Sequence, residues 1–285
     1  MRFNLKKYPK LHYVSQVIYF TGKSFVHDLC PQKAAALSYA TLLALVPTTA
    51  LLVLYFKMAG KFSALSQSLH QLIFNIFVAE AAQNASEYMD RIIANIHTRS
   101  LGLLGFLGLI LSLYFALRTI ERSMNDIWKT QKHRSIFRRF KILTYALLLT
   151  PALMIASVYL TGKLQGNRFI HPSQAVSPYG RTLLVLLPFI LSAFTFFVIN
   201  TVLPNTKVQG KFAFISALIS SALFEGAKFW FNFYFIHVIS ANRIFGALAL
   251  IPLLLVWIFV SWLIILIGVE LTFTLQNYSS LRNSS

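Results

Sequence analysis

Long uncharged stretches alternate with short charged segments along this sequence of 285 residues. A helix needs about 20 predominantly apolar residues to cross a bilayer, so each stretch of that length predicts a membrane span. Six stretches qualify, although one of them carries two ionisable residues. The pattern therefore predicts an all-α fold, with residues 1–285 forming a single integral membrane domain built as a polytopic transmembrane bundle of six helices. The predicted spans are residues 34–56, 100–117, 142–162, 182–206, 212–235 and 244–269.

Two segments outside these spans carry apolar residues at helical spacing. One lies within the long connection 57–99, and the other covers residues 11–29 near the N-terminus. Such periodicity predicts amphipathic helices that lie along the membrane surface. Prolines inside four of the spans predict kinks rather than breaks, because neighbouring helices can satisfy the carbonyl groups that a proline frees. These prolines are Pro47, Pro151, Pro188 and Pro252.

The composition agrees with a bilayer as the solvent of this chain. Hydrophobic residues make up 56% of the sequence and charged residues only 12%, which is about half the charged fraction of soluble domains. Cys30 is the only cysteine, so no intrachain disulfide can form. Residues 1–33 are basic and lack the apolar core of a cleavable signal peptide, so the first span is expected to direct insertion.

The distribution of positive charge predicts the orientation of the chain. A net charge of +18 would suggest nucleic-acid binding in a soluble protein, but membrane proteins collect Lys and Arg in their cytoplasmic loops. Most of these residues fall before the first span, in the loop 118–141 and near Lys207 and Lys211. We therefore expect no nucleic-acid partner, and a multi-pass protein of the bacterial cytoplasmic (inner) membrane with both termini in the cytoplasm.

The fifth predicted span carries most of the candidate chemistry. Its polar residues Ser221, Glu225, Lys228 and Asn232 are spaced four, three and four apart, which places them on one helix face. Charges inside a membrane are costly and usually mark a functional path, so these four residues are candidates for the lining of a substrate path. The alternative is a structural ion pair between Glu225 and Lys228, which at i and i+3 can contact each other.

Two further charged regions lie at the ends of spans. Arg118, Arg122, Lys129 and Lys132 are candidate contacts for anionic lipid headgroups. The alternative for this loop is a topological signal with ion pairs along a continuing helix. For Glu270, at the end of the sixth span, we expect a structural role, either at the inner interface or against Lys or Arg of another span.

No familiar catalytic pattern accompanies these charges. The seven histidines are scattered and form no cluster with acids that would supply three convergent metal ligands. The chain has no phosphate-binding lysine loop, no GxSxG and no GxGxxG before a helix. We therefore expect a protein that is not an enzyme and that uses no metal and no cofactor.

Five segments resemble the YihY/BrkB family of bacterial inner-membrane proteins, which has also carried a ribonuclease label. They are residues 33–47, 203–208, 222–228, 245–252 and 268–271. The resemblance implies six spans, an inner-membrane location and an incompletely defined function, with links to virulence and to the movement of lipid or lipid-linked material. It assigns no role to Glu225 or Lys228, although both lie inside one of the matching segments.

Three functions follow as hypotheses. The first is a transporter or flippase-like protein for an amphipathic or anionic substrate such as a lipid, because polar residues line one span and the inner surface is basic. The second is a non-transporting scaffold for envelope assembly, which would bind other envelope proteins or further copies of itself. The third, a membrane-tethered ribonuclease, is disfavoured because nothing in the sequence supplies a nuclease site. Membrane lipids are expected partners in the first case.

Overall fold

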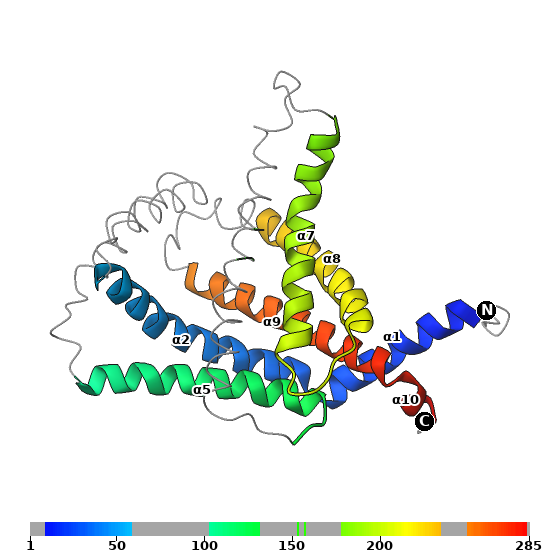
Figure 1. Cartoon of the computed structure of the whole chain (residues 1–285), viewed down its shortest axis with the longest axis horizontal. Coiled ribbons are helices and arrows are strands. Elements are labelled where there is room, and N and C mark those ends of the chain that lie inside the picture. The colour runs from blue at the N-terminus through cyan, green and yellow to red at the C-terminus, as the bar shows by residue number, and fades with distance from the viewer. Residues whose placement is uncertain are drawn as a thin grey trace.

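The computed structural model describes residues 9–58, 103–131, 153, 157, 178–234 and 250–283. These residues form seven α-helices and no strand (Figure 1), which confirms the all-α prediction for the described part of the chain. The helices are α1 (Pro9–His27), α2 (Cys30–Met58), α5 (Leu103–Ile127), α7 (Pro178–Val202), α8 (Gly210–Tyr234), α9 (Leu250–Gln276) and α10 (Tyr278–Asn283).

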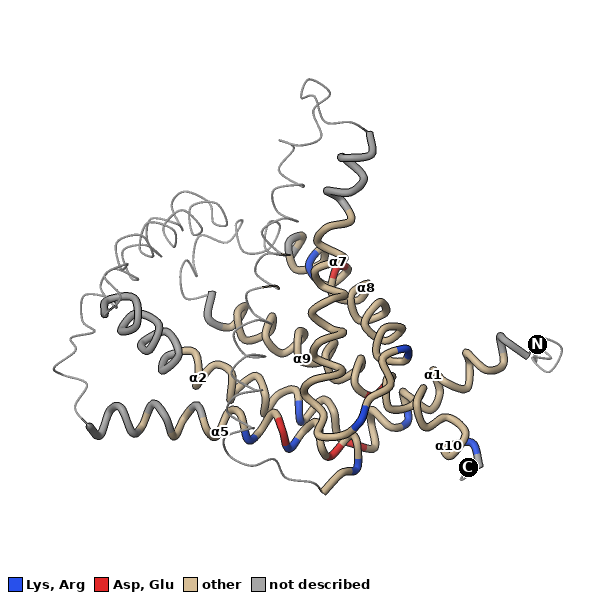
Figure 2. The backbone as a smooth tube through the Cα atoms, in the orientation of Figure 1, with Lys and Arg blue, Asp and Glu red and all other residues tan. Residues whose placement is uncertain are grey.

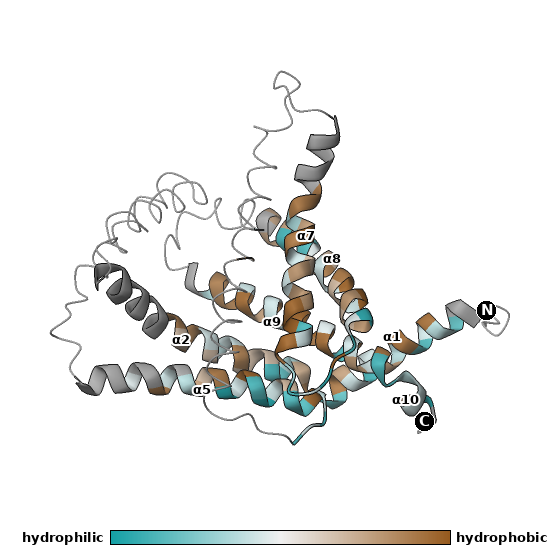
Figure 3. Ribbon diagram, viewed as in Figure 1, coloured by the Kyte–Doolittle hydropathy of each residue, from teal (hydrophilic) through white to brown (hydrophobic). Residues whose placement is uncertain are grey.

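Helix α9 forms the centre of the bundle. It contacts α1, α2, α5, α7, α8 and α10, and it crosses between the α2–α5 pair and the α7–α8 pair in Figure 1. Its sequence is strongly apolar (Figure 3) and has no distinct polar face, as expected for a helix that contacts neighbours on several sides. Leu266 and Val269 are fully buried there, packed with Leu37 of α2, Leu117 of α5 and Phe196 of α7.

A single glycine lets two helices approach α9 closely. A Cβ atom built on Gly268 would clash with the Ser220 hydroxyl of α8 and would lie 3.5 Å from the Asn200 amide group of α7. Small residues at helix contacts commonly allow such an approach in membrane proteins. Gly268 therefore fixes how tightly α7 and α8 pack on the central helix.

The predicted spans and the observed helices agree in position but differ at their ends. Helix α9 continues to Gln276 rather than ending at residue 269, so Glu270 lies inside a helix. Helix α5 continues past residue 117 to Ile127, which confirms the predicted helical extension. Helix α7 begins and ends four residues before the predicted fourth span, and α8 closely matches the fifth. The third span, 142–162, lies outside the described residues apart from 153 and 157.

Two helices in the described part of the chain are long and apolar enough to cross a membrane, by their length and composition. They are Gly210–Phe231 within α8 and Pro252–Gln276 within α9, and Leu186–Val202 in α7 is a shorter apolar helix. The fold is therefore helical with two candidate spans, and the six-span bundle stays a prediction. Helices α2 and α7 continue without a break through Pro47 and Pro188, and the expected kinks at these prolines stay a prediction.

The predicted amphipathic helix over residues 11–29 corresponds to α1. Val17 and Phe20 are buried, and Val17 packs against Leu271 and Leu275 of α9. The opposite apolar residues Val14 and Ile18 remain exposed. One side of α1 therefore packs against the bundle, and apolar side chains on another side of α1 remain exposed. The predicted helices within 57–99 lie almost entirely outside the described residues.

Most Lys, Arg, Asp and Glu residues of the described part of the chain lie towards one edge of the bundle, whereas Glu225 and Lys228 lie apart from it in α8 (Figure 2). The α1–α2 turn, the C-terminal end of α5, the α7–α8 connection and the C-terminal end of α9 meet there. Backbone turns set two of these boundaries, since Leu29 and Lys129 have φ angles of 53° and 50°. After α5, the Thr130 amide donates to the Asn125 carbonyl, as in a left-handed helix C-terminal cap.

Candidate functional site

An ion pair lies within α8, inside the bundle. Lys228 Nζ and Glu225 Oε1 are 2.7 Å apart, and their side chains are 5% and 24% exposed. The predicted contact between these two residues is therefore confirmed. The Lys228 ammonium also lies 5.5 Å from the centre of the Phe224 ring, a distance at which a cation is attracted to an aromatic face.

Hydroxyl groups from other segments complete the surroundings of the pair. Ser192 of α7 donates to Glu225 Oε1 at 2.8 Å, and Lys228 donates to the Ser157 hydroxyl at 3.0 Å. The hydroxyls of Ser157 and Ser192 are themselves 2.9 Å apart, and Ser157 also donates to the Pro188 carbonyl at 2.9 Å. We call these four residues, Ser157, Ser192, Glu225 and Lys228, the intramembrane polar cluster.

The other two predicted path residues behave differently. Ser221 is fully buried and donates to the Phe189 carbonyl of α7 at 2.9 Å, so its hydroxyl binds α7 rather than the ion pair. Asn232 lies on α8, but its side chain is outside the described residues. The role of these residues as the lining of a path therefore stays a prediction.

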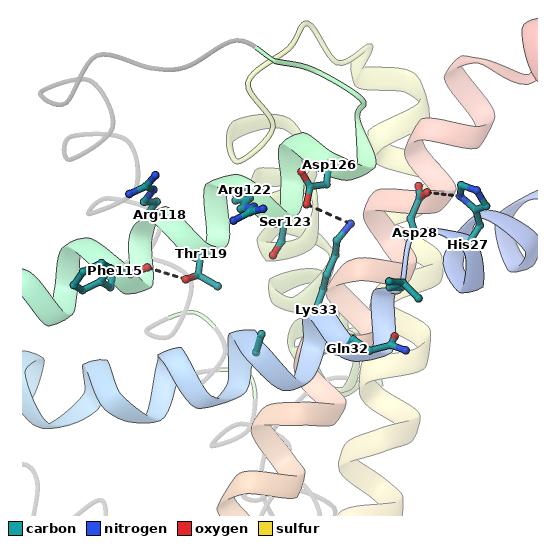
Figure 4. A pocket seen from close by; sticks show the side chains of 12 residues that line it. His27, Asp28, Gln32, Lys33, Phe115, Arg118, Thr119, Arg122, Ser123 and Asp126 are labelled. Atoms are coloured by element: carbon teal, nitrogen blue, oxygen red, sulfur yellow. Dashed lines mark hydrogen bonds and ion pairs between the residues drawn. The ribbon is translucent and has the colours of Figure 1, made fainter.

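A cationic groove lies at the charged edge, between the start of α2 and the end of α5. Its volume is about 760 Å³, and it extends over the α1–α2 turn (Figure 4). The residues of α5 that line it form two adjacent rows with a spacing of four and so share one helix face. They are Phe115, Arg118, Thr119, Arg122, Ser123 and Asp126. A second hollow of about 650 Å³ also includes Arg118 and Arg122.

The acids of this groove are engaged and its two arginines are free. Lys33 of α2 reaches towards Asp126, with their charged atoms 3.7 Å apart, and His27 Nδ1 lies 2.9 Å from Asp28 Oδ1 (Figure 4). No ion pair joins Arg118 or Arg122 to another residue of the described part of the chain. The ion pairs along α5 that the sequence offered as an alternative do not involve these arginines.

Of the two predicted lysine contacts, the structure describes only Lys129, which does not line the groove. Lys129 follows the last turn of α5, and its ammonium lies 5.5 Å from the centre of the Phe273 ring of α9. Lys129 lines neither of the two hollows that contain Arg118 and Arg122. Lys132 lies outside the described residues.

Glu270 occupies a position that the sequence did not predict. It is fully buried in α9, and its Oε1 accepts a hydrogen bond of 3.4 Å from the Cys30 thiol of α2. Of the two placements that the sequence left open for a structural role, the one at the end of a span does not hold, because α9 continues past Glu270 and the residue is buried. The Cys30 thiol is fully buried as well, so this contact joins the first turn of α2 to the central helix.

The burial of Cys30 allows a direct test of this packing. A maleimide should label Cys30 of the folded protein at least about ten-fold more slowly than an accessible thiol, because attack requires an exposed thiolate. Cys30 is the only cysteine, so labelling followed by mass spectrometry reports on this residue alone. The Leu29→Cys/Cys30→Ala variant places the thiol on the neighbouring, 54% exposed position and should label rapidly. Equal rates for the two thiols would contradict the packing of α2 on α9.

Ser157, Ser192 and Cys30 were missed by the sequence analysis. Isolated serines in apolar spans are common, and only the packing of separate helices shows which of them meet a charge. Among the described residues, no three His, Cys, Asp or Glu side chains are grouped so that they could hold a metal ion.

Comparison with known proteins places this chain among membrane proteins. A protein of Aeromonas salmonicida, named UPF0761 membrane protein, is 35% identical over 91% of this chain and 88% of its own length. A protein of Coxiella burnetii with the same name is 36% identical over 86% of this chain and 88% of its own length.

A third relative is longer than this chain. The UPF0761 membrane protein of Alkalilimnicola ehrlichii is 31% identical over 93% of this chain, which spans only 59% of that relative. No solved structure matches. The family described as Virulence factor BrkB matches residues 21–285. With apolar helices around a central span and relatives of this name, the chain is a membrane protein that belongs to the BrkB family.

Proposed function

We propose that this protein transports or flips an amphipathic, anionic substrate of the lipid class across the bacterial inner membrane. The intramembrane polar cluster is the observation that supports this function best. Burying a charged pair costs free energy that an apolar pair would not, and ionisable groups inside membrane proteins usually serve transport or binding. Membrane lipids are the partners that this function requires.

The geometry of the cluster suits a path better than a sealed structural contact. Glu225 keeps 24% of its side chain exposed while Lys228 keeps 5%, so the carboxylate lies at the accessible side of the pair. Serine hydroxyls bond to both charges, and a hydroxyl can rotate to donate or accept when a polar substrate group replaces one of its partners. An anionic group could therefore approach Lys228 without leaving Glu225 unpaired.

The proposed topology has six spans with both termini in the cytoplasm. The charged edge of the bundle would then face the cytoplasm, as the excess of Lys and Arg requires. Without a nucleotide-binding motif, transport would follow an ion gradient or be passive. Labelling of the Leu29→Cys/Cys30→Ala variant by an impermeant maleimide only after cells are opened would support this orientation, and labelling in intact cells would contradict it.

The transport test compares the wild-type protein with the variant Glu225→Gln/Lys228→Met, reconstituted into sealed vesicles with fluorescent phosphatidylglycerol. The wild type should make the inner-leaflet probe accessible to an external quencher. The variant should reduce this rate by about ten-fold or more, because it removes both charges of the path while preserving the approximate size of the side chains. Applying a proton or sodium gradient to the same vesicles would reveal a driving ion.

The control for this test is Lys23→Met, which removes an exposed lysine of α1 far from the cluster in sequence. It should transport at the wild-type rate. Normal transport by Glu225→Gln/Lys228→Met would contradict the proposed path and would indicate that the cluster is a structural contact. If wild-type vesicles show no movement of any tested lipid, and mild-detergent purification yields a stable complex with other envelope proteins, the scaffold function replaces the transporter.

A further inference from the structure

We infer that the cationic groove between α2 and α5 binds the phosphate group of an amphipathic molecule, with Arg118 and Arg122 as its ligands. Binding in the groove does not depend on transport. Only the subsequent movement of the bound molecule across the membrane rests on the proposed function. The inference identifies phosphate as the anionic group of the substrate and the C-terminal end of α5 as the site where the substrate first binds.

The two arginines carry positive charges that no acidic side chain of the described residues pairs with. Arg118 and Arg122 are exposed, one helical turn apart on the same face of α5, and unpaired among the described residues. Like charges at i and i+4 repel each other, so an anion between them would relieve the repulsion. Guanidinium groups present a planar fork of donors that matches phosphate oxygens. The neighbouring Thr119 and Ser123 add hydroxyl groups at the groove.

The acids of the groove do not cancel this site. Asp126 is held by Lys33, and Asp28 is held by His27. The close-up shows Lys33 reaching across from α2 to Asp126, while the two guanidinium groups follow one another along α5 (Figure 4). The free positive charge of the groove is therefore concentrated on the arginines rather than spread over its walls.

The groove continues into an exposed apolar surface, which indicates that its ligand has an apolar part. Towards the predicted membrane interior, α2 exposes Tyr39 and Leu43, and α5 exposes Leu111 and Phe115. Tyr39 and Leu43 follow the groove residue Ala36 by three and seven positions, and Leu111 precedes Phe115 by one turn, so both pairs continue the groove-facing side of their helices. A phosphate at the arginines would place its acyl chains along this surface.

The arginines also stand at the depth where a headgroup lies. The second predicted span ends immediately before Arg118, and α5 continues beyond it as a charged helix. Arginine at a span end, beside the headgroup region, suits recognition of anionic lipid. Free phosphate would use the same arginines but would gain nothing from the apolar surface, so the two sources can be separated by experiment.

The test measures lipid retention by the delipidated full chain, using native mass spectrometry in detergent. The probes are dioleoyl phosphatidylglycerol, dioleoylglycerol with the same chains and no phosphate, and inorganic phosphate. The wild type should retain one phosphatidylglycerol far better than dioleoylglycerol. Arg118→Gln/Arg122→Gln should weaken this retention by about ten-fold or more, because it removes the charge-assisted hydrogen bonds. Ala36→Trp should weaken it similarly, by filling the groove without changing any charge.

Two matched controls accompany these variants. Lys207→Gln/Lys211→Gln removes two exposed lysines outside the groove, and Ala35→Trp adds the same bulk at an exposed alanine that does not line it. Both should retain phosphatidylglycerol like the wild type. Equal retention by all variants, or equal loss in Lys207→Gln/Lys211→Gln, would overturn the inference. Arginine-dependent binding of inorganic phosphate without retention of the lipid would overturn the amphipathic ligand and assign the groove to free phosphate.

The same variants separate this inference from the proposed transport. Glu225→Gln/Lys228→Met should retain phosphatidylglycerol in the groove while it loses transport. Loss of retention in the arginine variant, together with unchanged transport by Glu225→Gln/Lys228→Met, would support the groove and refute the path. If the arginine variant retains the lipid and Glu225→Gln/Lys228→Met loses transport, the path is supported and the groove is refuted.

Discussion

Lys228→Met should destabilise the helix bundle by about 3 kcal/mol, because removing one partner of a buried ion pair leaves the other charge uncompensated. Glu225 would keep the hydroxyl bonds from Ser192 and Ser157 but no cation, and Ser157 would lose its bond from the lysine. The value lies at the low end for buried pairs because the Glu225 side chain is 24% exposed. The free energy of unfolding, measured by denaturation in mixed micelles with tryptophan fluorescence as the signal, checks this expectation.

The double variant Glu225→Gln/Lys228→Met serves as the control for this measurement. It removes both charges together, so its destabilisation should be markedly smaller than that of Lys228→Met alone. A double-mutant cycle completed with Glu225→Gln then gives the coupling energy between the two residues. Additive effects of the two single substitutions would contradict a direct interaction. A folded double variant is also the condition under which the transport test can be interpreted.

Gly268→Leu should destabilise the bundle by about 3 kcal/mol, since a side chain forced into a filled contact shifts its neighbours and strains their rotamers. Even a Cβ atom at this position would clash with the Ser220 hydroxyl and would contact Asn200 at 3.5 Å. A leucine must therefore push α7 and α8 away from α9. The same denaturation measurement applies, and the purified variant should also lose the protection of Cys30 from maleimide.

Gly226→Leu provides a matched control for this substitution. Gly226 lies in α8, and nothing stands within 4 Å of a Cβ built there. Leucine has a higher helix propensity than glycine by several tenths of a kcal/mol, so this variant should be as stable as the wild type or slightly more so. If Gly268→Leu and Gly226→Leu unfold alike, the close approach of α8 to α9 is incorrect.

The hydrophobic pattern predicted the positions of the helices because bilayer thickness and uncharged length are properties of a single segment. Spacing along α8 also predicted its inner face, and Ser221 and Lys228 are indeed buried there. The end of α9 was harder to predict. Glu270 was taken as the end of a span because a charge usually marks the interface, whereas here the Cys30 thiol and the packing of α2 allow it to lie inside.

The partners of the predicted site residues could not be read from one sequence. Ser192 and Ser157 lie 33 and 68 positions from Glu225, and neither belongs to a pattern that distinguishes it from other hydroxyls in apolar helices. The groove could not be predicted for the same reason. The sequence showed Arg118 and Arg122 as a basic pair, but it did not show that the start of α2 lies opposite them. Contacts between distant segments depend on packing, which local spacing does not encode.

The central position of α9 has a consequence for biogenesis. Proteins are synthesised and inserted from the N-terminus. Helix α9 therefore leaves the ribosome after all five of the helices α1, α2, α5, α7 and α8, each of which contacts it in the folded protein. Until then Ser220 and Asn200 have no glycine of α9 to pack against. The α2–α5 pair and the α7–α8 pair can therefore form early, but the two pairs are joined through the central helix only once α9 has been inserted.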